Sequence, residues 1–233
     1  ATGVLTESAV TGTGTYPALP RYFYMYRPDL KQPDKAAEFT TVTFAETVDM
    51  VRKFAGDSAK DKRAKLVDQL LAAPCYAVRM EELFHVMLME RRGDNPLWQS
   101  YLKNSFAANK PWDQMAGEIL RAAAKEESLH GAGFFYTKRL ENYGENPIDY
   151  PGLTRDVGRL FLGVDLQCAE CHNHLFIEDY KQRDFQGLFA VYKNLAIRRG
   201  VEYPAVTENL MTTKWEFVSV FDPTQRETGP RVP

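Results

Sequence analysis

The pattern of hydrophobic positions changes character near residue 40. Before that point, alternating threonine and glycine and several prolines interrupt any regular period, and only the aromatic segment 21–26 favours a short strand. From residue 44 onward, apolar side chains recur every three or four positions, which is the spacing of one buried helix face. The pattern therefore predicts an irregular N-terminal segment, 1–40, that packs on a helical domain, 41–233.

Capping residues and helix-breaking glycines and prolines divide this domain into about five to seven helices. Thr43 and Glu46 form a capping box at the first helix, and Thr154 with Asp156 caps the helix that leads toward residue 168. The predicted helices span 43–56, 58–74, 76–92, 94–106, 109–123, a segment from 154 toward 168, and 182–194.

The helix predicted over 76–92 has two contrasting sides. We expect its apolar side to face the core and its polar side to face water. The apolar side carries Met80, Leu83, Phe84 and Met87, and the polar side carries Glu81, Glu82, His85 and Arg92.

A strand is predicted near the C-terminus, where residues 215–221 alternate between apolar and polar side chains. This strand could pair with the aromatic segment 21–26 and so tie the two ends of the chain together. The sequence therefore predicts a mainly α fold, a multi-helix domain with a small two-stranded β element from the N- and C-terminal segments.

Composition and charge exclude two classes of partner. Hydrophobic residues make up 44% and charged residues 26% of the chain, which is ordinary globular composition, and the formal net charge is −2. We therefore expect no nucleic-acid partner, because no basic stripe is present. The apolar runs are too short to cross a bilayer, so we expect no transmembrane segment.

Two of the three cysteines fall in one short motif, Cys168-Ala169-Glu170-Cys171-His172. C-x-x-C-H is the attachment signature of c-type haem. Two thiols at this spacing can bond the two vinyl groups of one porphyrin, and the next residue supplies an imidazole as the proximal iron ligand. The motif therefore predicts a covalently attached haem c on Cys168, Cys171 and His172. The remaining Cys75 is predicted to be a small buried hydrophobe.

Two other interpretations of the motif stay open at this stage. A zinc ion could use Cys168, Cys171, His172 and His174, although zinc sites usually space their histidines three to five residues apart. A bare redox-active dithiol is the other alternative.

The sixth iron ligand is not determined by the motif. His174 is too close to His172 along the chain to reach the opposite face of a haem, so we expect it to bind a propionate or to cap local backbone. The candidate distal ligands are His85, His130, in a glycine-rich run that could approach haem closely, and Met89. Each also has a structural interpretation: His85 as a solvated side chain on a polar face, His130 as a surface or structural residue, and Met89 as a core residue. Met87 is a weaker candidate for the distal ligand. An open or water-bound iron is the further alternative.

Several segments resemble a planctomycete-type domain of unknown function that carries an internal C-x-x-C-H motif. The similarity extends over residues 44–233, and Leu175 stands where the family usually has proline. The matching stretches are 65–74, 88–94, 109–114, 161–174 and 184–189. This resemblance implies a mostly helical, extracytoplasmic haem domain, in the periplasm or at the cell surface. It also implies that the chain is an excised part of a longer protein with a further C-terminal domain.

These observations together predict a monohaem c-type cytochrome domain that transfers single electrons to or from a redox partner protein. We favour electron transfer over catalysis. Two alternatives remain: a haem enzyme or sensor whose open iron handles peroxide or a diatomic ligand, and a structural or binding module of a large secreted protein.

Overall fold

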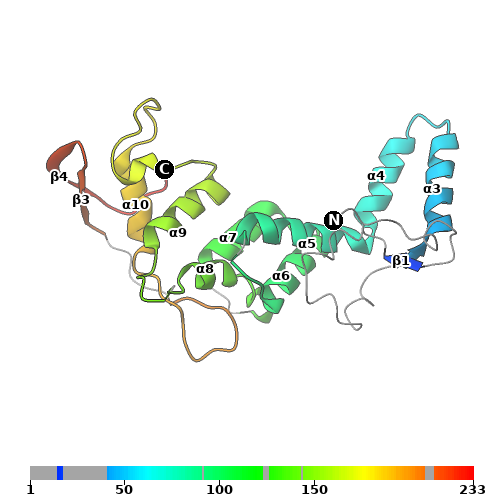
Figure 1. Ribbon diagram of the computed structural model, residues 1–233, viewed down its shortest axis with the longest axis horizontal. Helices are drawn as coiled ribbons and strands as arrows, with labels where there is room; N and C mark the ends of the chain where they lie inside the picture. Colours follow the sequence, from blue (N-terminus) through cyan, green and yellow to red (C-terminus); the bar gives the residue numbers. More distant parts are fainter. Residues whose placement is uncertain (1–14, 18–40, 91, 123–125, 143, 208–212) are drawn as a thin grey trace. The chain divides into compact units, whose positions relative to one another are not determined.

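The computed structural model describes residues 15–17, 41–90, 92–122, 126–142, 144–207 and 213–233. It divides the chain into two compact units, residues 1–80 and 81–233. Figure 1 shows the order of the elements along the chain. Eight α-helices, α3 to α10, are present in the described part of the chain, so the predicted mainly α fold is confirmed.

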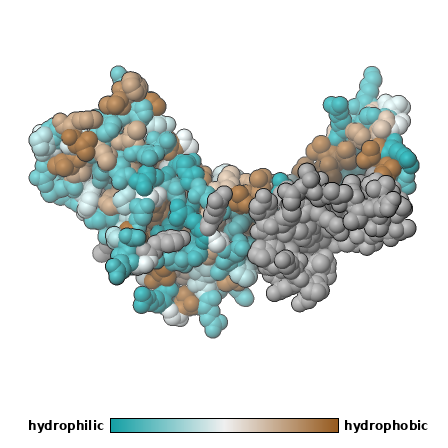
Figure 2. Space-filling view, viewed as in Figure 1, coloured by the Kyte–Doolittle hydropathy of each residue, from teal (hydrophilic) through white to brown (hydrophobic). Residues whose placement is uncertain are grey.

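The first unit is built from two short strands and two helices. Strands β1 (Thr15–Pro17) and β2 (Thr41–Thr43) are antiparallel, and α3 (Phe44–Gly56) and α4 (Lys62–Ala72) follow. These helices confirm the predictions over 43–56 and 58–74. No residue of α4 is buried, and its exposed apolar residues are visible in Figure 2. The predicted strand 21–26 lies outside the described residues.

The second unit is helical up to its C-terminal hairpin. Helix α5 spans Pro74–Met89 and lies across the division between the units along the chain. The remaining α-helices are α6 (Pro96–Ala107), α7 (Trp112–Arg121), α8 (Phe134–Arg139), α9 (Tyr150–Val157) and α10 (Gln182–Tyr192). None of the helices among the described residues is long and apolar enough to cross a membrane.

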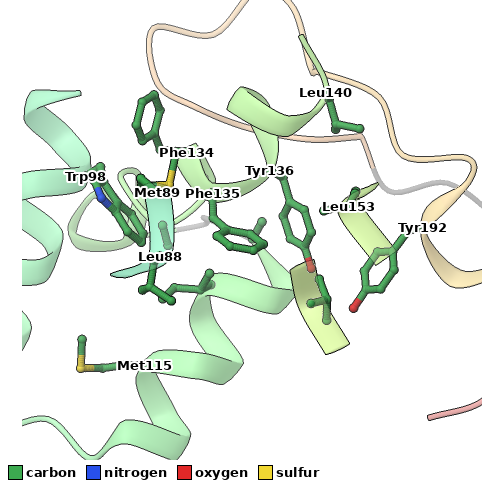
Figure 3. Packing of buried hydrophobic residues seen from close by; sticks show 14 of the residues in the cluster. Leu88, Met89, Trp98, Met115, Phe134, Phe135, Tyr136, Leu140, Leu153 and Tyr192 are labelled. Atoms are coloured by element: carbon green, nitrogen blue, oxygen red, sulfur yellow. The ribbon is translucent and has the colours of Figure 1, made fainter. Parts of the chain in front are cut away.

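An aromatic core holds the second unit together. Trp98 of α6, Phe135 of α8 and Phe185 of α10 are almost completely buried. Figure 3 shows how rings from α6 and α8 pack beside Leu88 and Met89 at the end of α5. Met115 and Ile119 of α7 pack into the same cluster.

The predicted orientation of α5 is wrong in part, because Phe84 packs against the core as expected but other residues do not follow the prediction. Glu81 and His85 are buried, whereas Leu83, Val86 and Met87 are exposed. The helix instead turns Leu88 and Met89 into the core, which brings the residues one and two turns earlier inward with them. Hydrogen bonds make this arrangement possible for His85, because they satisfy its buried polar atoms.

The helix before the motif starts earlier than predicted. Asp149, and not Thr154, is the N-cap of α9, and its Oδ1 accepts a hydrogen bond of 2.8 Å from the Gly152 amide. Thr154 is buried inside the helix, where its hydroxyl donates to the Tyr150 carbonyl oxygen at 2.9 Å. Asp156 is also buried, and its carboxylate forms ion pairs with arginine side chains instead of capping the helix.

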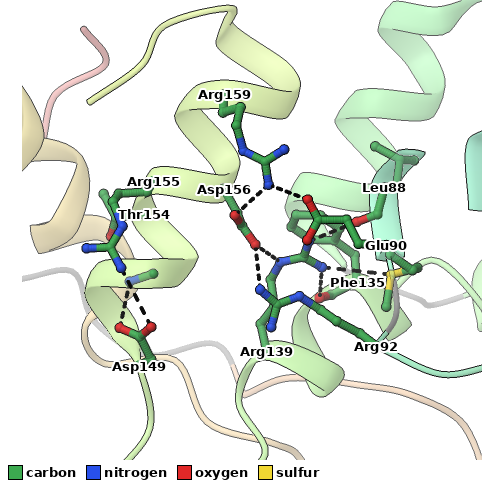
Figure 4. Close-up of polar contacts among 12 residues, drawn as sticks. Leu88, Glu90, Arg92, Phe135, Arg139, Asp149, Thr154, Arg155, Asp156 and Arg159 are labelled. Carbon is green, nitrogen blue, oxygen red and sulfur yellow. Dashed lines mark hydrogen bonds and ion pairs between the residues drawn. The ribbon is translucent and has the colours of Figure 1, made fainter. Parts of the chain in front are cut away.

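Asp156 lies at the centre of an ion cluster that has a buried centre and an exposed edge, shown in Figure 4. We call it the Asp156 cluster; its members are Glu90, Arg92, Arg139, Asp156 and Arg159. Its shortest ion pair joins Arg139 Nε to Asp156 Oδ2 at 2.7 Å, and Arg139 also donates to the Leu88 carbonyl oxygen at 2.8 Å. The cluster therefore joins the ends of α5 and α8 to α9.

The two protonation equilibria at the centre of the cluster reflect opposing effects. Burial alone would raise the pKa of Asp156, but the surrounding guanidinium groups outweigh that effect and hold the pKa below its ordinary value. Burial lowers the pKa of Arg139 to about 10, although the Asp156 carboxylate opposes this shift.

The predicted C-terminal strand is confirmed, but its observed partner differs from the prediction. Strand β3 (Trp215–Ser219) pairs antiparallel with β4 (Asp222–Thr228), so both strands of this small sheet come from the C-terminal segment. A connection this short costs little loop-closure entropy, which favours the neighbouring partner over a distant one. Trp215 Nε1 donates to Gln186 Oε1 of α10 at 2.8 Å and so fixes the hairpin on that helix.

Candidate functional site

The C-x-x-C-H motif lies in a tight turn after α9. Helix α9 continues into the π-helical turn η4 (Gly158–Leu162), which ends at Gly163 in the left-handed conformation, with φ of 68°. The chain then enters the 3-10 helix η5 (Cys168–Glu170). The amides of Cys171 and His172 both donate to the Cys168 carbonyl oxygen at 3.3 Å. We call residues 168–172 the motif turn.

The motif turn is exposed on one side and anchored on the other. Both cysteines are exposed free thiols, whereas Ala169 between them has 0% exposure. The side chain of Glu170 forms an ion pair with Arg155 of α9, and its carbonyl oxygen accepts from Gln186 Nε2 of α10 at 3.0 Å. Helices α9 and α10 therefore hold the turn while both thiols stay accessible.

His172 is half-buried and has one ring nitrogen engaged. Its Nδ1 lies 2.6 Å from the Asn173 carbonyl oxygen, so Nδ1 carries the proton and donates. The lone pair of the neutral imidazole is then on Nε2, which is the nitrogen that can bind a metal. The ring of Phe221 packs against this imidazole, with the two ring centroids 4.8 Å apart.

His174 caps local backbone, one of the two roles considered for it. Its Nδ1 accepts hydrogen bonds from the amides of Phe176 at 3.2 Å and Ile177 at 2.9 Å. Its own amide donates to the Tyr180 carbonyl oxygen at 2.8 Å. These bonds close the loop after the motif and occupy the Nδ1 lone pair.

Exposed apolar side chains flank the motif turn, in the loop that follows it and in the β3–β4 hairpin. We call this set the apolar rim; it consists of Leu175, Phe176, Ile177, Val218, Val220 and Phe221. Phe176 is 88% exposed and Phe221 is 70% exposed, which is unusual for phenylalanine. Figure 2 shows hydrophobic residues gathered over the loop beside α10 and over the β3–β4 hairpin. The amide of Val220 donates to the Cys171 carbonyl oxygen at 3.1 Å, so the hairpin lies directly against the motif turn.

The described residues do not assemble the zinc site considered from the sequence. No group of three or more histidine, cysteine, aspartate or glutamate side chains in this part of the chain is placed to hold a metal ion. The motif turn instead offers two thiols and one imidazole nitrogen, which is a set suited to a cofactor that brings its own metal ligands.

Two of the predicted distal ligands have other partners. His85 Nδ1 accepts a hydrogen bond of 3.1 Å from Trp98 Nε1, and His85 Nε2 lies 2.9 Å from Asp94 Oδ1. Both ring nitrogens are therefore engaged, and His85 is buried rather than solvated. Met89 is completely buried, with its sulfur 3.8 Å from Arg139 Nη1.

His130 forms a ring stack at the edge of the domain. Its imidazole lies parallel to the ring of Tyr203, with centroids 3.7 Å apart. The glycines that follow serve chain packing: a Cβ on Gly131 would lie 2.1 Å from the Leu97 carbonyl oxygen, and one on Gly133 would lie 2.3 Å from that of Pro204. The predicted close approach to haem is therefore not needed to explain this glycine-rich run.

The residues that support the motif turn were not found from the sequence. Gln182 donates its amide to Asn173 Oδ1 and its Nε2 to the Val218 carbonyl oxygen, both at 2.9 Å. Gln186 bridges Glu170 and Trp215 in the same way. A glutamine has no sequence signature for such a role, so only the packing of α10 against the turn and the hairpin shows it.

Comparison with known proteins gives one family and no individual relative. The family model PSCyt2, described as a protein of unknown function (DUF1549), matches residues 37–196. No curated protein and no solved structure matches the chain. The matched region contains the motif turn and α10 and ends before the β3–β4 hairpin. Because it covers more than half of the sequence, the chain belongs to the PSCyt2 family, a planctomycete-type domain of unknown function.

Proposed function

We propose that this domain is a monohaem c-type cytochrome domain that transfers single electrons outside the cytoplasm. One arrangement carries the proposal: two exposed thiols and an imidazole with an available Nε2 share one anchored turn beside the apolar rim. Cys168 and Cys171 would carry the haem, and His172 would be the proximal iron ligand. Redox exchange with a partner protein follows from this assignment.

The two thiols are suited to covalent attachment. Each S–H adds across one vinyl group: a carbon–sulfur bond forms, the double bond becomes single, and the proton passes to the other vinyl carbon. This addition needs no oxidant, and both Cys168 and Cys171 are exposed and free to undergo it. Since such attachment normally takes place outside the cytoplasm, a periplasmic or cell-surface location is part of the proposal.

His172 is prepared for its role by the Asn173 carbonyl. The hydrogen bond at Nδ1 fixes the tautomer and the ring orientation, and it makes Nε2 a better donor to a metal. When bound, haem supplies the one-electron chemistry through its iron. The protein contributes the ligand, its orientation and the polarity of the surroundings.

The apolar rim supports the same proposal. Contiguous exposed apolar side chains on a domain surface usually mark a binding site. A porphyrin presents a broad apolar face, and fully burying one phenylalanine side chain against such a face is worth roughly 1.5–3 kcal/mol. Phe176 and Phe221, the two most exposed members, are the side chains with most to gain.

The alternative of a purely structural haem is less well supported. Both thiols are exposed, and Arg155 and Gln186 anchor the backbone between them. A haem attached to these thiols would therefore lie at the surface of the second unit and not within its aromatic core.

A second candidate, a haem iron open to small ligands, is favoured by one observation. Two of the three predicted distal ligands, His85 and Met89, are engaged inside the core. An open sixth position would permit binding of a diatomic ligand or peroxide chemistry.

Expression in a host that attaches haem tests the proposal. We expect wild-type protein to gain the mass of one haem, to show a Soret band and to give one reversible one-electron wave in voltammetry. The double variant Cys168→Ala/Cys171→Ala should lose the covalent haem, while the matched variant Cys75→Ala should keep it. The bare polypeptide mass without a Soret band would overturn the proposal. Carbon monoxide added to reduced protein distinguishes the candidates, because it changes the spectrum only if the sixth position is open.

A further inference from the structure

The C-terminal hairpin makes two separate contacts with the motif turn. The Val220 amide donates to the Cys171 carbonyl oxygen at 3.1 Å, and the Phe221 ring packs on the His172 imidazole. Both residues belong to the connection between β3 and β4, so one short segment contacts the backbone of a cysteine and the side chain of the adjacent histidine. The hairpin lies outside the region that defines the family, residues 37–196.

The hairpin is held in this place by α10. Gln182, almost completely buried, bridges Asn173 after the motif and Val218 of β3 through two hydrogen bonds of 2.9 Å. At the other end of β3, Trp215 donates to Gln186 and packs on Phe189, with centroids 5.4 Å apart. Gln182 and Gln186 of α10 therefore hold β3 at two places. These bonds keep Phe221, two residues after β3, close to His172 in addition to the ring contact itself.

We propose that Phe221 is a positioning residue that fixes the plane of the His172 imidazole and shields it from water. The Nδ1 bond to Asn173 restrains the imidazole at one atom, and a ring packed at 4.8 Å with an interplanar angle of 46° restrains its rotation. This inference rests on the proposed haem function only for its redox consequence.

The redox consequence follows from charge and solvent. Ferric haem carries one more positive charge than ferrous haem, and water stabilises the more charged form. An apolar shell that limits water near the proximal histidine therefore raises the reduction potential. Phe221 would act through His172, not on the electron itself.

The test compares Phe221→Ala, Phe221→Leu and the control Val86→Ala, all made in the haem-loaded chain of residues 1–233. Val86 is an exposed apolar residue on α5 with no part in the motif turn. We expect Phe221→Ala to shift the reduction equilibrium about tenfold toward the ferric form, which is ~59 mV for one electron. Phe221→Leu should recover part of the shift, and Val86→Ala should leave the potential unchanged. An unaltered potential in Phe221→Ala with haem attached would overturn the inference.

Nuclear magnetic resonance of the haem-free chain keeps this test separate from the proposed function. The Phe221 ring should shift the His172 ring-proton resonances through its ring current, and Phe221→Ala should abolish that shift. If wild-type protein binds no haem but shows the ring-current shift, the haem proposal fails and the positioning contact stands. If the protein attaches haem when it is loaded, but the haem-free chain shows no ring-current shift, the positioning role fails and the haem proposal stands. Should Phe221→Ala not fold, the wild-type spectrum and Phe221→Leu decide the outcome.

Discussion

Two neighbouring residues of α9 connect this helix to two different regions. Asp156 belongs to the Asp156 cluster, and Arg155 forms an ion pair with Glu170 of the motif turn. Asp156 faces the interior, where guanidinium groups surround its carboxylate, while Arg155 next to it reaches the motif turn. In the cluster, Asp156 and Arg139 are buried and form ion pairs, and Glu90 and Arg159 extend the cluster to the surface. In the motif turn and the apolar rim, thiols and apolar side chains are exposed, although hydrogen bonds hold the backbone of the turn in place.

This difference distinguishes a region that stabilises the fold from a region that is suited to bind a cofactor or another partner. Within the cluster, the buried Asp156 and Arg139 each have an oppositely charged partner. The motif turn and its apolar rim leave reactive and hydrophobic groups uncovered, which costs solubility unless a partner covers them. Substitutions in the cluster should therefore mainly lower the free energy of unfolding. Substitutions in the motif turn or the apolar rim should mainly weaken cofactor binding.

The largest expected effect comes from breaking the cluster. Asp156→Ala leaves the guanidinium of Arg139, whose side chain is 1% exposed, without its carboxylate. We expect the free energy of unfolding to fall by about 3–5 kcal/mol, measured by urea denaturation. Asp68→Ala on the exposed face of α4 is the control and should change it by less than ~0.5 kcal/mol. Equal effects of the two substitutions would contradict the central role of Asp156.

Acid should weaken the cluster through the same carboxylate. The folded-state pKa of Asp156 is below its ordinary value, so its contribution is complete above the unfolded-state pKa near ~4. That contribution is lost as the pH falls from this value through the folded pKa. Urea denaturation between neutral and acidic pH should therefore show a steeper loss of stability in wild type than in Asp156→Ala. Parallel curves would show that Asp156 does not titrate in this way.

A smaller effect is expected at His85, and it bears directly on the haem site. His85→Leu leaves the indole N–H of Trp98 buried without its acceptor, which should cost about 1–3 kcal/mol of unfolding free energy. Because both nitrogens of His85 are engaged in the core, the oxidised and reduced spectra of haem-loaded protein should not change. A spectrum that indicates loss of an axial ligand would identify His85 as the distal ligand after all.

The smallest effect on the haem-free fold is expected in the apolar rim. Phe176 is almost fully exposed, so Phe176→Ser should alter the unfolding free energy of haem-free protein by less than ~0.5 kcal/mol. If the rim covers a haem, the same substitution should lower the melting temperature of the loaded protein. Calorimetry on both forms makes the comparison, and equal responses would remove the rim from the binding surface.

The sequence predicted seven of the eight α-helices of the described residues, all but α8, and it proposed the candidate residues of the site. Capping residues, glycines and prolines act locally, so most helix boundaries follow from them, and C-x-x-C-H is contiguous in the chain. The inverted face of α5 could not be predicted, because the burial of His85 depends on Trp98 and Asp94 in the segment that follows. The start of α9 was missed because two caps competed and Asp149 prevailed.

The surroundings of the site depend on contacts between distant segments. Phe221 meets His172, and Gln182 joins Val218 to Asn173, across separations that leave no periodic signal. The predicted pairing of 215–221 with 21–26 used alternation alone, and alternation does not identify a strand's partner. Only the fold specifies these contacts.

Ala169 gives the motif turn a property that its chemistry alone does not suggest. Of the two residues between the cysteines, Glu170 pairs with Arg155, whereas Ala169 has 0% exposure and belongs to the aromatic core. A larger side chain at this position has no free space, so it would have to displace its neighbours in the core. We therefore expect substitution of Ala169 by a bulkier residue to disturb Cys168, Cys171 and His172 together, because all of them belong to the same short turn.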